Sequence, residues 1–144
     1  MKHLHEEAIS IQRSGFLWKT GPNFKCFKYR WCILCRNSRS LCDANFSYYF
    51  NRNSMSVSLS GKVMLSEIEF VSVVDTIPNK TRLPKVEKCK DSGENLSLAF
   101  FEIGTKCKQG RIYLLAARSS NDRQHWMHAF IQSLTLHSFG NKGK

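Results

Sequence analysis

The sequence predicts a mainly β fold, in which seven short strands are followed by one C-terminal α-helix. From residue 15 to residue 117, short runs rich in β-branched and aromatic residues alternate with polar or Gly- and Pro-containing stretches. After residue 119, apolar or small residues recur at the i, i+3, i+4, i+7 and i+8 spacing of one helical face. With 144 residues, 42% of them apolar, the chain is long enough for one domain with its own core. The helical-face residues are Trp126, Ala129, Phe130, Ser133 and Leu134.

Turn signals separate the predicted strands. Gly21 and Pro22 end the first strand, and Gly61 opens the fourth. The fifth strand is rich in β-branched residues, and the last two are expected to pair as a hairpin. We predict strands over residues 15–20, 27–35, 46–50, 61–65, 68–74, 96–103 and 111–117.

The helix and the segments outside the strands complete the predicted organisation. Ser119 or Ser120 offers an N-cap oxygen, and Asp122 suits the positive end of the helix dipole. Residues 78–93 carry five cations and are expected to form a basic loop, either as a second electrostatic contact or as a solvated insertion. Residues 1–13 are polar and lack a strong period, so we expect a flank or a short helix there. The predicted organisation is this flank, one domain over 14–136 and a tail over 137–144.

The net charge of the chain indicates which classes of partner it can bind. A formal net charge of +11 favours attraction to polyanions, whether nucleic acid, anionic lipid or an acidic protein. Residues 15–52 hold seven basic residues against one acidic residue, whereas a merely solvated surface normally mixes both signs. Cations and aromatic rings interleave in this region, most densely in GFLWKTGPNFKCFKYRWCIL, residues 15–34. We therefore expect an anion-binding surface there.

Cysteine usage and hydropathy indicate the compartment. The first fifteen residues lack the apolar segment of a signal peptide, and no run approaches the roughly 18 to 20 apolar residues of a membrane-spanning helix. We expect a cytoplasmic chain whose six cysteines are reduced. Cys32 and Cys35 have a zinc-like spacing, but they lie in a predicted strand, where residues three apart point to opposite faces. His125 and His128 share a helical side without a third ligand nearby, so neither a metal nor a cofactor is expected.

These elements, with these residues, resemble a pleckstrin homology (PH) domain. The resemblance covers residues 14–136 and depends on the order and spacing of several motifs together. It implies a seven-stranded, strongly bent antiparallel sandwich, or partly open barrel, with one open corner capped by the C-terminal helix. The motifs are Gly15-Phe16-Leu17-Trp18-Lys19, Lys28-Tyr29-Arg30-Trp31-Cys32-Ile33-Leu34, Tyr48-Tyr49-Phe50, Gly61-Lys62-Val63-Met64-Leu65 and, in the helix, Trp126.

The resemblance also implies a phosphoinositide-binding site. The family signature is a basic residue late in the first strand and Lys/Arg-x-Arg in the second, and Lys19, Lys28 and Arg30 match it. Lys28 and Arg30 project on the same face of their strand because they are two residues apart. That face continues to Cys32 and Leu34, as expected for a strand whose charged end lines an anion pocket and whose other end is core. The implied headgroup ligands are Lys19, Lys25, Lys28, Arg30 and Tyr49. Phe24 and Phe27 flank Lys25 in the loop after the first strand, and we expect them to contact the membrane by shallow insertion between headgroups, unless one of the two rings packs back onto the core.

Two positions depart from the pattern of tight trisphosphate binders in this family. Asn23 stands where such domains often carry a further basic residue, and Ser60 lacks a charge that some of them have. Lys62 could substitute for the missing charge near Ser60. These departures argue against narrow isomer choice.

The implied function is a non-catalytic, monomeric phosphoinositide-binding module. It would recruit its parent protein to the inner face of a membrane, with a preference for 3-phosphorylated phosphoinositides. The alternative is a protein-interaction or scaffolding domain with weak or nonspecific binding of anionic lipid. Nucleic-acid binding is disfavoured because the three tryptophans have structural roles in a PH domain, and no nucleic-acid partner is expected. No nucleotide-binding, protease or hydrolase motif is present, so no catalytic residue is expected.

Overall fold

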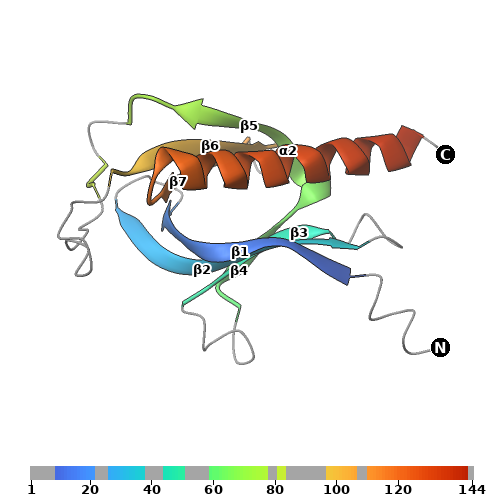
Figure 1. Cartoon of the computed structure of the whole chain (residues 1–144), viewed down its shortest axis with the longest axis horizontal. Helices are drawn as coiled ribbons and strands as arrows, with labels where there is room; N and C mark the ends of the chain where they lie inside the picture. Colours follow the sequence, from blue (N-terminus) through green and yellow to red (C-terminus); the bar gives the residue numbers. More distant parts are fainter. Residues whose placement is uncertain are drawn as a thin grey trace.

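The structure, a computed structural model, describes residues 9–21, 26–37, 44–50, 59–77, 81–83, 97–106 and 110–142, with the backbone alone at positions 9, 37 and 136–142. Seven antiparallel strands form one sheet in the order β4-β3-β2-β1-β7-β6-β5. Figure 1 shows this sheet curving around the helix α2, with β5 and β6 on one side of it and β1 to β4 on the other. The expected fold, an open and bent antiparallel sheet with a C-terminal helix, is confirmed. The elements are β1 (Ile9–Thr20), β2 (Phe27–Asn37), β3 (Asn45–Tyr49), β4 (Gly61–Met64), η3 (Leu65–Glu67), β5 (Ile68–Val74), β6 (Ala99–Thr105), β7 (Ile112–Ala117) and α2 (Ser120–Lys142).

The first strand begins earlier than the sequence predicts. Residues 9–13, expected to be a flank or a short helix, pair with β2 as part of β1. Ile11 is 59% exposed, so pairing with β2 rather than burial holds this part of the strand. The register also shifts between Ile11 and Arg13, which interrupts the period of two. Hydrophobic periodicity therefore carries no strand signal in this segment.

The helix α2 closes the core, as predicted. Its inner face places Trp126 and Phe130 against Phe46, with ring centroids 6.0 and 5.1 Å from that ring. All three side chains are at most 1% exposed. Of the two N-cap candidates it is Ser119 that caps the helix, since its hydroxyl accepts a hydrogen bond from the Asp122 N–H at 3.0 Å. The Asp122 carboxylate also pairs with Arg13 at 2.6 Å, which ties the helix to β1.

Strand pairing sets the place of the candidate site. Lys19 lies opposite Lys28 near the end of the β1–β2 hairpin. On its other side β1 pairs with β7, where Lys19 lies opposite Leu115. The end of β1 is therefore flanked by the start of β2 and the start of β7, although β7 is about ninety residues away in the sequence.

Candidate functional site

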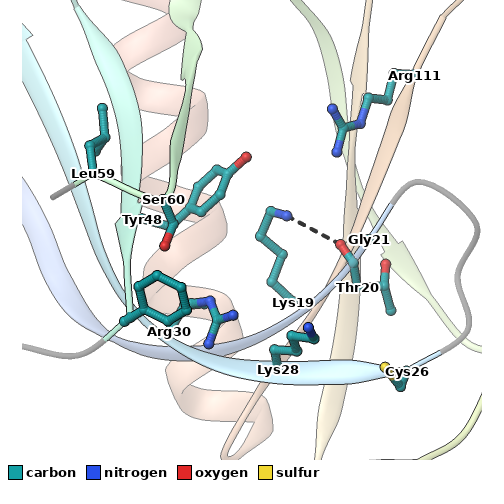
Figure 2. A pocket seen from close by; sticks show the side chains of 11 residues that line it. Lys19, Thr20, Gly21, Cys26, Lys28, Arg30, Tyr48, Leu59, Ser60 and Arg111 are labelled. Carbon is teal, nitrogen blue, oxygen red and sulfur yellow. Dashed lines mark hydrogen bonds between the residues drawn. The ribbon is translucent and has the colours of Figure 1, made fainter.

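A cavity of about 650 Å³ opens at this end of the sheet. Figure 2 shows side chains from β1, β2 and β3 and from the start of β7 directed into it. Four of its lining residues are cations, and none is acidic. The lining residues are Lys19, Thr20, Gly21, Cys26, Lys28, Arg30, Tyr48, Phe50, Leu59, Ser60 and Arg111.

Alternation along β2 brings the predicted cations to the cavity. Lys28 and Arg30 line it, while Cys32 and Leu34, the next residues on that face, are fully buried in the core. The same face of β1 carries Leu17 in the core and Lys19 in the cavity. The predicted change from a charged mouth to an apolar interior along this face is confirmed.

Lys19 is the most deeply placed of the cations. Its side chain is only 8% exposed. The ammonium donates a hydrogen bond to the Thr20 carbonyl oxygen at 3.2 Å and lies 4.2 Å from the ring centroid of Tyr48. Burial, aided by the positive charges of Arg111 and Arg30, lowers the pKa of Lys19 from 10.5 to about 8. A carbonyl and aromatic faces compensate only in part for lost hydration, so the site favours an added anion.

Arg30 is held at the mouth by an aromatic ring. Its guanidinium lies 4.7 Å from the ring centroid of Phe50 and donates a hydrogen bond to the Tyr29 carbonyl oxygen at 3.1 Å. Stacking leaves the edge of a guanidinium free to donate to further acceptors. The group is therefore oriented and still able to bind a phosphate with two hydrogen bonds.

Arg111 also lines the cavity, although nothing in the sequence except its charge indicates this position. It precedes β7, and its guanidinium lies 4.3 Å from the ring centroid of Tyr113. Its carbonyl oxygen accepts hydrogen bonds from the Thr105 N–H at 3.0 Å and the Thr105 hydroxyl at 2.8 Å, which fixes the start of β7. Only the pairing of β7 with β1 brings Arg111 to Lys19, and strand order is not visible in the pattern of residues.

The tyrosine that lines the cavity is Tyr48, whereas the family resemblance implied Tyr49. Tyr49 lies opposite Trp31 on β2, a position on the other face from Arg30, and it is not among the lining residues. Tyr48 lies opposite Cys32, so it shares the face of the cations. Burial raises the pKa of the Tyr48 hydroxyl, which therefore remains a proton donor at neutral pH.

Gly61 provides the space that Tyr48 occupies. The two residues face each other across β3 and β4, and a Cβ at position 61 would overlap the Tyr48 hydroxyl and ring. We expect Gly61→Ala to push Tyr48 off its site and to lower the free energy of unfolding by about 1–3 kcal/mol, as overpacking does. Thermal or urea denaturation measures the change. Gly21→Ala is the matched control, because a Cβ at this glycine of the cavity lining would meet no atom within 4 Å. Equal effects of the two substitutions would contradict this role of Gly61.

The other predicted contacts fall partly outside the described residues. Phe24, Lys25 and Asn23 lie in the undescribed segment 22–25, and most of the basic stretch 78–93 is also undescribed. Phe27 is half-buried, with its ring centroid 5.7 Å from that of Phe100. Ser60 lines the cavity, but Lys62, the suggested substitute for a charge there, does not.

The described part of the chain offers neither a cluster of metal-ligating side chains nor a membrane-spanning helix. It contains no group of three or more His, Cys, Asp or Glu side chains arranged to hold a metal ion. None of its helices is long and apolar enough to span a membrane. The side-chain groups that line the cavity are four cations, hydroxyl groups, aromatic rings, the Cys26 thiol and the Leu59 side chain.

Comparison with known proteins identifies the family. The PH domain family model matches residues 11–135. The chain belongs to the PH domain family. No curated protein matches the sequence significantly.

Solved PH domains share the fold. The solution structure of the C-terminal PH domain of human pleckstrin is 25% identical, with a TM-score of 0.58 over 88% of this chain and 81% of that one. A crystal structure of the C-terminal PH domain of pleckstrin in complex with D-myo-Ins(1,2,3,4,5)P5 is 24% identical, with a TM-score of 0.56 and coverage of 86% and 98%. The solution structure of the PH domain of human oxysterol binding protein-related protein 11 is 18% identical, with a TM-score of 0.56 and coverage of 89% and 83%.

Proposed function

We propose that the cavity binds the phosphorylated inositol headgroup of a phosphoinositide and thereby recruits the protein to a membrane surface. The observation that carries this proposal is Lys19, a residue only 8% exposed, with no acidic residue among the residues that line its cavity. A buried charge without a counter-charge is costly in a folded protein. A polyanionic ligand would supply the missing counter-charge.

The four cations differ in what they offer such a ligand. Arg30 and Arg111 can each donate two parallel hydrogen bonds to one phosphate. Lys19 and Lys28, opposite each other on β1 and β2, act as point charges. The Tyr48 hydroxyl takes the donor role that the family resemblance implied for its neighbour. Several phosphates on one ring would satisfy these groups together better than a single phosphate could.

The proposed function includes a ligand preference, an oligomeric state and a location. The domain prefers 3-phosphorylated phosphoinositides, acts as a monomer at the inner face of a membrane, and is non-catalytic, as PH domains generally are. Lys25 adds a phosphate contact, and Phe24 and Phe27 add membrane contacts. The pleckstrin domain solved with D-myo-Ins(1,2,3,4,5)P5 supports the ligand class, because it is a PH domain with an inositol phosphate as its ligand.

Vesicle sedimentation tests the recruitment. We expect the protein to sediment with vesicles that contain a 3-phosphorylated phosphoinositide, and much less with phosphatidylserine vesicles of equal total charge. If binding depended only on the total charge of the vesicles, the cavity would act as a nonspecific basic patch and not as a headgroup site. A domain that ignores lipids but retains a protein partner would instead support the interaction-module alternative.

A further inference from the structure

Three large apolar side chains are exposed on segments that line or adjoin the cationic cavity. Phe50 and Leu59, which flank the segment between β3 and β4, line the cavity and are 59% and 44% exposed. Leu83 is 62% exposed and follows Arg82, which pairs with Cys26 of the cavity wall. In Figure 2, Leu59 lies on one side of Lys19 and Cys26 on the other. The exposed apolar side chains therefore come from both sides of the mouth.

This combination of chemistry fits a lipid bilayer. Peripheral proteins bind membranes through apolar side chains that enter the acyl boundary beside cations that meet the anionic headgroups. Here four cations line the cavity with no acidic residue in the lining, and exposed apolar side chains lie in the lining and on the adjoining segment of residue 83. The net charge of +11 is complementary to an anionic leaflet.

We propose that Phe50, Leu59 and Leu83 form an apolar rim that enters the bilayer while the cavity between them holds the headgroup. The inference rests on the proposed function, since it assumes that the anion in the cavity belongs to a lipid. It goes further because it assigns membrane contact to the β3–β4 side of the mouth and to residue 83, in addition to the loop between β1 and β2. Phe50 has a second role, because its ring also stacks on Arg30.

The test uses Leu59 and Leu83, because the ring of the third rim residue, Phe50, also stacks on Arg30. We expect Leu59→Ser with Leu83→Ser to weaken binding to phosphatidylcholine and phosphatidylserine vesicles carrying a phosphoinositide by about tenfold, from the apolar area no longer buried. Calorimetric affinity for soluble inositol phosphates is expected to stay at the wild-type value in Leu83→Ser alone, because Leu83 lies outside the cavity lining. Ile131→Ser is the matched control, because Ile131 is 51% exposed on α2 and lies outside the cavity lining.

A tryptophan at position 83, outside the cavity lining, provides an independent readout. The emission of Leu83→Trp, after subtraction of the wild-type emission, is expected to shift to shorter wavelength with phosphoinositide vesicles but not with soluble inositol phosphates. Wild-type vesicle affinity of the double serine variant, or an unshifted emission, would overturn the rim while leaving the headgroup cavity intact. If the double serine variant loses vesicle binding while the wild-type protein binds no soluble inositol phosphate, the result would support the rim and overturn the cavity.

Discussion

Lys19→Met is expected to abolish inositol phosphate binding and, at the same time, to raise the melting temperature of the ligand-free domain. The pKa of Lys19 is lowered from 10.5 to about 8, chiefly by burial. Below a pH of about 8 the ammonium is charged in both the folded and the unfolded chain, so the folded state carries the full cost of burying it. That cost is relieved only as the pH rises from about 8 towards 10.5.

The stabilisation expected for Lys19→Met follows from the lowered pKa of Lys19. The favourable contacts that the ammonium makes with its neighbours must be subtracted from it. Methionine has a similar length and no charge, but it loses the hydrogen bond to Thr20 and the contact with the Tyr48 ring. We expect a net stabilisation of about 1–2 kcal/mol at neutral pH, seen as an increase of several degrees in melting temperature. Circular dichroism on heating measures this increase.

Lys28→Met is the matched control for charge removal. Lys28 lies opposite Lys19 and also lines the cavity, but it is exposed, so its removal relieves no buried charge. We expect weaker binding without a gain in stability. A Lys19→Met protein that binds like the wild type, or one that is less stable than the wild type, would contradict the role given to this buried lysine.

Arg30→Ala is expected to lower the affinity for soluble inositol phosphates by at least about twentyfold, the range for losing a charge-assisted, two-pronged contact. Arg30 is already oriented by the Phe50 ring, so little side-chain entropy is lost on binding. Calorimetric titration measures the loss, and vesicle sedimentation should fall in parallel.

Arg36→Ala distinguishes binding in the cavity from general attraction by the net charge. Arg36 lies on the same strand as Arg30, opposite Ser10, and outside the cavity. The substitution therefore removes the same unit of charge without removing a ligand contact. We expect its affinity for soluble inositol phosphates to remain near the wild-type value at physiological salt, where distant charges are screened. Equal losses in the two variants would mean that total charge, and not the cavity, binds the anion.

Patterns along the chain were sufficient to predict the strand order in sequence, the C-terminal helix and the cationic face of β2. These features depend on local periodicity and on turn residues, which act within one element. The start of β1 was not predictable in this way, because residues 9–13 are held by hydrogen bonds to β2 with little burial. Pairing of this kind leaves no apolar pattern.

The missed site residues have a different cause. Tyr49, which the family resemblance implied, and Tyr48, which lines the cavity, are neighbours, and in a strand a shift of one residue moves the side chain to the opposite face. Two adjacent tyrosines give the sequence no means to choose between the faces. Arg111 became visible only with the sheet order, which places β7 beside β1. Long-range pairing is the information that the residue pattern lacks.

Calorimetric titration of the wild-type protein with a panel of soluble inositol phosphates tests the central claim most directly, because no membrane contributes to the signal. We predict saturable binding at a single site, tighter for ligands with a 3-phosphate and accompanied by proton uptake, since an anion in the cavity raises the lowered pKa of Lys19. The affinity should therefore fall as the pH rises from about 7 to about 9. An absence of saturable binding near neutral pH, or an affinity unaffected by pH across this range, would contradict the account.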